Sequence, residues 1–100
     1  MKYLILLLFL VGCSFSEVDL IHVIDGDTFE YNNERIRLLD VYAPELNEEF
    51  GEEARIELTN LLYGKEIKLI GNETDKYNRS LRIVYANGIN VNEEMKHFLK

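Results

Sequence analysis

The sequence predicts an α+β domain built on a five-stranded OB-fold barrel, with one helix after the third strand and a short helix at the C-terminal end. Three observations predict it. Short runs of branched and aromatic residues alternate with turn-forming residues, one longer amphipathic stretch follows the third run, and 100 residues allow a single domain with a modest core. Five strands with a helix after the third match the OB-fold, a small Greek-key barrel. We expect this domain to span residues 17–100.

Three strands are expected in the first half of this domain, at residues 17–25, 28–31 and 35–42. The first reads EVDLIHVID and is rich in branched residues, which favour strands. Asp25-Gly26-Asp27 is a turn sequence between the first and second strands. Asn32-Asn33 fits a hairpin between the second and third, because asparagine tolerates positive φ. Pro44 ends the third strand, since it lacks the N–H donor that a sheet requires.

The main helix is expected at residues 48–62. Its apolar residues recur at steps of three and four, which places them on one face; they are Phe50, Ala54, Leu58, Leu61 and Leu62. Acidic residues crowd the first turns, where the helix dipole favours negative charge. Gly64 is the stop signal.

Two further strands are expected at residues 66–70 and 81–85, separated by a polar loop at residues 71–78. Asn87-Gly88 is a turn sequence that closes the second of them. Asn92 is expected to cap a final helix that runs to Lys100, because an asparagine side chain can accept a hydrogen bond from the first helical turn. The apolar positions of that helix are Met95, Phe98 and Leu99.

Residues 1–12 are expected to be a signal peptide. Lys2 gives a short basic start, and residues 3–11 form an apolar run far shorter than the roughly 20 residues that span a bilayer. The run ends in Leu10-Val11-Gly12-Cys13, which resembles the lipobox of bacterial lipoproteins, and Cys13 is the only cysteine. The resemblance implies lipidation of Cys13 and a membrane anchor at the bacterial cell envelope. The alternative is an ordinary cleaved signal peptide.

The charge of the chain limits how it could bind a polyanion. Eleven basic and 18 acidic residues give a formal net charge of -7. Residues 1–12 contain only the charge of Lys2, so the remainder carries -8. This acidity opposes loose electrostatic binding to nucleic acid. Nucleic-acid binding would therefore require a local basic cluster or a bound cation.

Three segments carry most of the residues suited to chemistry, and they read IDGDTF at residues 24–29, RLLDVYAPE at 37–45 and TDKYNRSL at 74–81. The staphylococcal nuclease, or thermonuclease, family has I-D-G-D-T, then R-L-x-x-x-D-x-P-E, then T-D-K-Y-G-R. The order and spacing agree, as do the helix between the second and third segments and the closing Val91-Asn92-Glu93. The chain resembles this family over about residues 18–98. The resemblance implies an SNase-like OB-fold and a nuclease acting on DNA, RNA or both.

Phosphodiester hydrolysis requires positive charge near the transition state and an activated water. Oxygen ligands suit calcium, and arginine forks bind phosphate oxygens in pairs. The resemblance implies a Ca²⁺ cofactor and assigns seven site residues. These are the metal ligands Asp27 and Ala43 (through its backbone carbonyl), the general base Glu45, the phosphate-binding Arg37 and Arg79, and the substrate-binding Lys76 and Tyr77.

Two positions depart from the family pattern. Tyr42 stands where the family has an aspartate that is the second carboxylate ligand, and losing an anionic ligand should weaken calcium binding. Asp40 is a candidate replacement, since in a regular strand it would project from the same face as Tyr42. Asn78 replaces the family glycine before Arg79, a milder change because asparagine can adopt similar turn geometry.

Two functional classes stay open. The first is a monomeric, envelope-anchored, calcium-dependent nuclease. The second is a catalytically weakened or inactive OB-fold module that binds a nucleic-acid end or an envelope partner. Tyr42, the acidic composition and a chain that ends at Lys100, before the further helix that family members usually carry, motivate the second. Taken singly, Arg37 would suit a surface ion pair and Glu45 the start of a helix.

Overall fold

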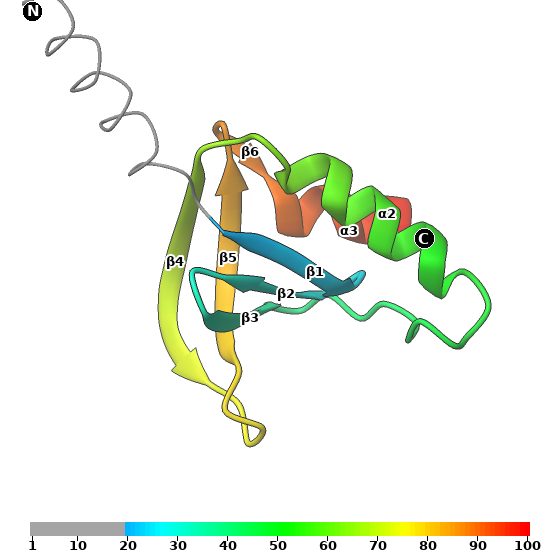
Figure 1. The fold of residues 1–100 in the computed structure, drawn as a ribbon, viewed down its shortest axis with the longest axis horizontal. Helices are drawn as coiled ribbons and strands as arrows, with labels where there is room; N and C mark the ends of the chain where they lie inside the picture. Colours follow the sequence, from blue (N-terminus) through cyan, green and yellow to red (C-terminus); the bar gives the residue numbers. More distant parts are fainter. Residues whose placement is uncertain (1–19) are drawn as a thin grey trace, which may run out of the picture.

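The computed structural model describes residues 20–100, in which six strands and two helices follow one another along the chain (Figure 1). The signal peptide expected at residues 1–12 and the candidate lipidation site Cys13 lie outside the described residues. The elements are β1 (Ile21–Asp25), β2 (Thr28–Tyr31), β3 (Glu34–Leu38), α2 (Gly51–Leu62), β4 (Ile67–Thr74), β5 (Ser80–Ala86), β6 (Ile89–Asn90) and α3 (Val91–Phe98). Within residues 20–100, no helix is long and apolar enough to cross a membrane.

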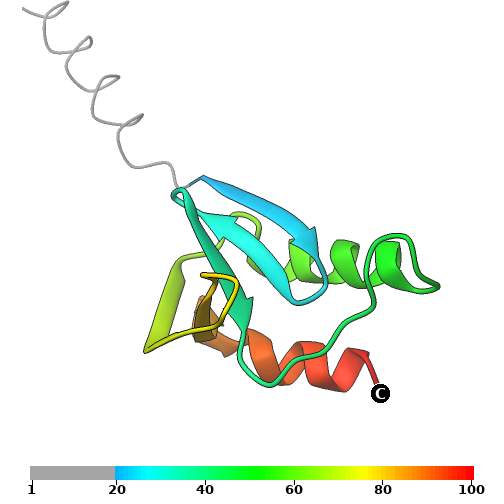
Figure 2. The same ribbon diagram turned by 90° about the horizontal axis from the view of Figure 1, so that it is seen from below.

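The strands form one mixed sheet in the order β1-β2-β3-β5-β4, with the short β6 paired to β5. Neighbouring strands run antiparallel except β3 and β5, which are parallel. Both helices lie on the same side of the sheet, and the connection from β3 runs past α3 to the start of α2 (Figure 2). This OB-fold-like α+β arrangement, with a helix after the third strand and a short helix at the end, confirms the predicted fold class.

The first two hairpins follow the sequence signals. Asn32 and Asn33 both have positive φ, 50° and 71°, as the predicted turn between β2 and β3 requires. The third strand, however, ends at Leu38 rather than at Tyr42 as predicted. Asp40 has a left-handed φ of 62°, and the Val41 N–H donates to the Leu38 carbonyl across the bend. The chain therefore leaves the sheet four residues earlier than its strand-like sequence suggests.

The main helix begins at Gly51, three residues later than predicted. Residues before it form turns instead, in which the Glu48 N–H donates to the Glu45 carbonyl and the Gly51 N–H to the Glu48 carbonyl. Phe50 has a φ of 68° and is 65% exposed, so its assignment to the buried stripe is wrong. The stripe otherwise packs inward as predicted.

The hairpin formed by β4 and β5 is longer than predicted. The polar sequence after Ile70 suggested a loop from Gly71, but β4 continues to Thr74 and pairs with the start of β5. Gly71 has a φ of 129°, and the pairing register shifts between Ile70 and Glu73. This irregularity lets a glycine-containing, polar segment stay in the sheet, because a bulge accommodates the unpaired residue.

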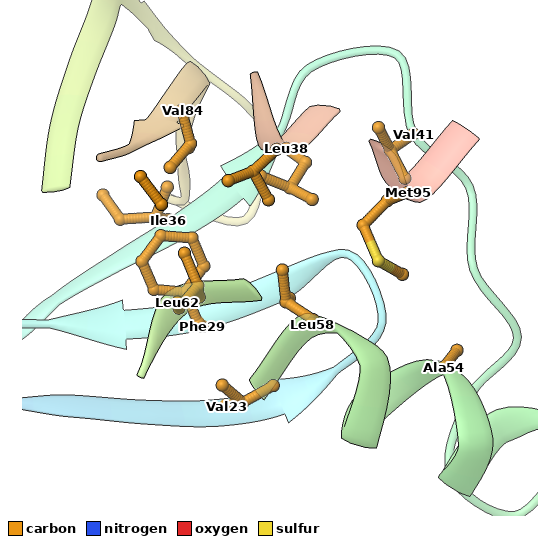
Figure 3. Packing of buried hydrophobic residues seen from close by; sticks show 12 residues of the cluster. Val23, Phe29, Ile36, Leu38, Val41, Ala54, Leu58, Leu62, Val84 and Met95 are labelled. Atoms are coloured by element: carbon orange, nitrogen blue, oxygen red, sulfur yellow. The ribbon is translucent and has the colours of Figure 1, made fainter. Parts of the chain in front are cut away.

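The core lies between the sheet and the two helices (Figure 3). Alternate residues of the strands and one face of each helix supply it, and each large side chain buried there contributes roughly 1.5–3 kcal/mol to folding. Its members are Val23, Phe29, Ile36, Leu38, Val41, Ala54, Leu58, Leu62, Val84, Ala86, Val91 and Met95. Of the apolar positions predicted for the final helix, Met95 is buried, Leu99 packs against the core, and Phe98 is partly exposed.

Asn92 is a buried bridge and not the predicted helix cap. Asn90 caps α3, its side chain accepting from the Glu93 N–H at 3.0 Å. The Asn92 side chain accepts from the Val84 N–H at 2.8 Å and donates to the carbonyls of Leu39 and Arg82, both at 3.0 Å. Asn92 thus fastens α3 to β5 and to the chain that follows β3.

Replacing Asn92 with alanine should lower the free energy of unfolding by about 2–4 kcal/mol, because it removes three hydrogen bonds, and of their backbone partners the Arg82 carbonyl keeps a second bond, from the Leu39 N–H. Urea denaturation of both proteins measures the difference. Asn72→Ala, at an exposed position of β4, is the matched control and should change stability by less than about 0.5 kcal/mol. An Asn92→Ala midpoint equal to the control's would contradict the bridge.

Candidate functional site

The carboxylate of Asp27 lies at the centre of the candidate site. It follows the turn between β1 and β2, and its residue is only 7% exposed. One oxygen accepts from the Thr28 hydroxyl at 2.8 Å. The other accepts from the Ala43 N–H at 2.9 Å and from the Arg37 guanidinium at 3.3 Å. Asp27 therefore joins β2, the end of β3 and the connection to α2, and it is both a structural and a chemical group.

The turn that carries Asp27 packs tightly under the connection and α2. A Cβ at Gly26 would lie 2.6 Å from the Ala54 Cβ and 2.8 Å from the Ala43 Cβ, so a side chain there would collide with both. At the start of α2, a Cβ on Gly51 would overlap the Glu45 carbonyl oxygen. These two glycines allow the backbone around Ala43 and Glu45 to approach the Asp27 turn.

Asp25 is a candidate site residue that the sequence motifs indicated only as part of a turn. Its Oδ1 accepts from the Asp27 N–H at 3.1 Å, which places two carboxylates side by side. Burial raises the pKa of the Asp25 carboxyl to about 6, and the neighbouring Asp27 side chain adds to the rise. The Asp-Gly-Asp spacing was the available signal, because a tight turn brings its first and third side chains together.

Arg37 is fixed in position by several neighbours. Besides the Asp27 ion pair, its guanidinium donates to the Val41 carbonyl at 2.9 Å and to the Leu38 carbonyl at 3.2 Å. The last residue of β3 supplies one of these carbonyls, and the bend after β3 supplies the other. The Tyr42 ring lies over the guanidinium, 5.2 Å from ring centroid to Cζ. Arg37 therefore has little freedom to reorient, which suits a group that must meet a phosphate in one geometry.

Arg79 is held by Asp75 at the tip of the β4–β5 hairpin. Its Nε donates to Asp75 Oδ2 at 2.8 Å, while the backbone N–H groups of Tyr77 and Arg79 donate to Asp75 Oδ1. Burial by itself would raise the pKa of the Asp75 carboxyl, but these hydrogen bonds outweigh it and lower that pKa. Asn78 has a φ of 65°, as predicted for the replacement of a glycine. The Tyr77 ring lies near both Arg79 and Lys76, each at 5.3 Å.

A groove of about 400 Å³ joins the two arginines. The parallel pairing of β3 with β5 contributes to it, since Ile36 pairs with Ser80 and Arg37 with Leu81, which places the start of β5, directly after the hairpin tip, beside the second half of β3. Its charged and aromatic lining comprises Arg37, Asp40, Tyr42, Asp75, Lys76, Tyr77 and Arg79. Three cations thus gather on one face of an acidic protein, as binding of a polyanion requires.

Two predicted site residues stand apart from this groove's network. Glu45 is exposed on the connection, and within residues 20–100 no hydrogen bond or ion pair joins its carboxylate to Asp27, Arg37 or Arg79. Asp40 lines the groove but does not follow a regular strand, so the expected alignment with Tyr42 is wrong. Its left-handed backbone, described above, is the reason.

The donors near Asp27 suit a hard cation. Two adjacent carboxylates offer oxygen atoms, which are the ligands that Ca²⁺ prefers, and the predicted ligand residue Ala43 contacts Asp27 through its backbone N–H. The raised pKa of Asp25 reflects burial beside a second carboxylate, and a divalent cation would relieve that repulsion. Between residues 20 and 100, no cluster of three His, Cys, Asp or Glu side chains forms a metal-binding group. Asp25 and Asp27 would therefore need water to complete a coordination shell.

Comparison with known proteins shows the family that the chain resembles. A model of the staphylococcal nuclease homologue family matches residues 35–97, a range that includes Arg37, Glu45 and Arg79. A micrococcal nuclease of Shigella flexneri is 38% identical over 72 residues, which cover 68% of this chain and 41% of that protein. An uncharacterized endonuclease of Escherichia coli O157:H7 is 35% identical over 94% of this chain and 67% of its own length. The chain thus spans less than half of the first of these relatives.

The Asp25 carboxyl should make the stability of the cation-free protein depend on pH. The folded state keeps the Asp25 proton up to about pH 6, whereas an ordinary aspartate loses it near 3.8, so stability should fall as pH rises through this window. In a chelator, Asp25→Asn should raise the free energy of unfolding at pH 7 by about 1 kcal/mol, after allowance for solvent screening of a half-buried group.

Urea denaturation at pH 4 and pH 7 measures this effect. Asparagine keeps an oxygen that can accept from the Asp27 N–H, so the variant removes the charge and retains the hydrogen bond. Glu94→Gln is the matched control, because it removes the charge of an exposed carboxyl on α3. Asp75→Asn would not serve, because the pKa of Asp75 is itself lowered in the folded protein. An identical pH dependence in the parent and in Asp25→Asn would contradict the assignment.

Proposed function

This chain belongs to the family of staphylococcal nuclease homologues, and on that premise we propose that it hydrolyses phosphodiester bonds in DNA, RNA or both, with Ca²⁺ as its cofactor. The observation that carries the proposal is the groove in which Arg37 and Arg79 converge beside the buried Asp27. Two fixed guanidinium groups in one groove suit a single phosphate, because each can bind a pair of its oxygens.

The chain's own residues divide the work. Arg37 and Arg79 bind the phosphate oxygens and stabilise the charge that grows on them during attack. Lys76 and Tyr77 bind the substrate beside Arg79. Glu45 accepts a proton from the attacking water, and its exposed place on the connection leaves it free to meet that water when substrate is bound.

The cofactor would be held by Asp27, with Asp25 and the carbonyl of Ala43 beside it. Bound Ca²⁺ would supply positive charge to the transition state and favour deprotonation of a nearby water. Asp25 would be ionised in that complex, since a cation favours the charged form of a carboxyl. We expect the protein to act as a monomer, because the groove is built from one chain.

A second candidate function is binding without hydrolysis, by a weakened or inactive module that holds a nucleic-acid end or an envelope partner. The observation that favours it is Tyr42, which stands where a carboxylate ligand is expected and instead covers Arg37. In that case the groove would still bind phosphate, but cleavage would be absent.

Cleavage of single-stranded DNA separates the two functions. With millimolar Ca²⁺ the purified chain should cut it, and a chelator should abolish cutting. Glu45→Gln should lower the rate by about 10²–10⁴-fold, because it removes the general base. Glu94→Gln, an identical change at an exposed position on α3, is the control and should keep the parent rate. No cleavage by the parent above Glu45→Gln would leave the binding module.

We also propose that the protein is anchored to the bacterial cell envelope through lipid on Cys13. The support is the sequence Leu10-Val11-Gly12-Cys13 after a short apolar run, with no other cysteine in the chain. Stable anchoring takes more than one acyl chain, which lipidation of such a cysteine would supply.

Expression in bacteria with labelled palmitate tests the anchor. The parent should incorporate label and sediment with membranes, and Cys13→Ala should lose both properties. Ser14→Ala, at the next residue, should keep them. An unlabelled parent would exclude the lipid anchor and leave an ordinary signal peptide.

A further inference from the structure

Tyr42 is an unusually exposed aromatic residue at the edge of the groove. It is 76% exposed, although its ring lies over the Arg37 guanidinium at 5.2 Å. A guanidinium over the ring occupies one face, so the high exposure leaves the other face to solvent. Tyr42 also lines two neighbouring cavities, the arginine groove and a second cavity of about 350 Å³. It is therefore the shared wall between them.

The second cavity is mainly apolar and aromatic. The connection after β3 and the end of α3 form it, and Pro44, Phe50 and Phe98 line it together with Tyr42. Phe50 is 65% exposed and Phe98 is 42% exposed, so their rings are not part of the core. Its volume lies within the range of small-molecule sites, which is about 300–1,000 Å³. Lys100 and Glu49 lie at the same cavity and give it no strong net charge.

We propose that Tyr42, Phe50 and Phe98 form a base-stacking subsite for an unpaired nucleotide of the substrate, next to the phosphate bound by Arg37. This inference rests on the proposed function, because it places the base relative to the phosphate in the arginine groove. Exposed aromatic faces beside cations are what single-stranded nucleic acid requires, since bases stack on the rings while the backbone follows the positive charge.

The two ends of the groove support this arrangement. Tyr77, 67% exposed, lies over Arg79 at one end, and Tyr42 lies over Arg37 at the other. Each arginine is thus paired with a tyrosine that has an outward face. A phosphate between the arginines would have its two flanking nucleotides directed toward Tyr77 and Tyr42. Bases stacked inside a duplex cannot present their faces in this way, so the subsite selects unpaired strands.

A substrate with one cleavable bond tests the subsite in the full chain, purified in mild detergent with Ca²⁺. Each substrate is a short DNA strand with one natural phosphodiester among non-hydrolysable linkages. In the normal strand both nucleotides that flank this bond carry their bases. In each of two abasic strands, one of the two flanking nucleotides lacks its base. Tyr42→Leu should lower kcat/KM on the normal strand by about 5- to 100-fold, as expected for loss of one stacked base. On one of the two abasic strands the parent should lose a similar factor and Tyr42→Leu should cause little further loss.

Two further variants sharpen the result. Tyr42→Phe keeps the aromatic face, so its kcat/KM should still depend on the presence of the base. Phe98→Leu should weaken that dependence of kcat/KM, although residue 98 is not a contact of Arg37. Tyr63→Leu is the matched control, because Tyr63 is 78% exposed at the other end of the 12-residue α2, roughly 18 Å from the start of that helix.

The outcomes separate the possibilities. A loss in Tyr42→Leu that is equal on normal and abasic strands would mean that Tyr42 only positions Arg37, and would overturn the subsite. An effect of Tyr42→Leu no larger than that of Tyr63→Leu would also overturn the subsite. A dimer at assay concentration that Phe98→Leu dissociates would overturn it too, because the cavity would then be a contact between copies of the chain. If the parent cleaves nothing, the proposed hydrolysis fails, and binding of the same strands by fluorescence anisotropy then decides the subsite by the same base dependence.

Discussion

The buried carboxylate of Asp27 is the constraint on which the site depends. Three donors from separate parts of the chain converge on its two oxygens, namely the Thr28 hydroxyl, the Ala43 N–H and the Arg37 guanidinium. A buried charge without such partners would be strongly destabilising, so the chain must bring all three together in order to fold. The same requirement fixes Arg37 and the connection after β3 in the places that phosphate chemistry needs.

The rest of the site depends on one strand pairing. β3 and β5 are the parallel neighbours of the described sheet, and their register sets the start of β5, directly after the tip of the β4–β5 hairpin, beside the second half of β3. Asn92 strengthens this arrangement by bonding to Arg82 on β5 and to Leu39 just after β3. Residues about 40 positions apart in sequence therefore form one groove, and the buried amide of Asn92, with its hydrogen bonds satisfied, helps to hold β5 against the chain that follows β3.

Much of this was predictable from the sequence, and the exceptions have physical reasons. Apolar residues at steps of three and four indicated the buried face of the main helix, and the family resemblance of three ordered motifs implied that Asp27, Arg37 and Arg79 belong to one site. The role of Asn92 was not predictable, since capping and bridging asparagines look alike until the neighbouring strands are in place. The early end of β3 was missed because Asp40 adopts a left-handed backbone despite its strand-like surroundings. Asp25 was overlooked because its raised pKa arises from burial, which sequence does not display.

The connection between β3 and α2 has a consequence for how this segment can vary. Non-glycine residues with left-handed backbones, Asp40 and Phe50, stand near its two ends, and Val41 and Ala43 are fixed on either side of position 42 by burial and by the bond to Asp27. The side chain at 42 points to solvent, so its identity can change without moving the chain, whereas inserting or deleting a residue would displace Ala43 and Glu45 together. The length and backbone path of this segment are therefore fixed, whereas its exposed side chain at position 42 is free to vary. New binding properties can arise at Tyr42 without a change in the rest of the fold.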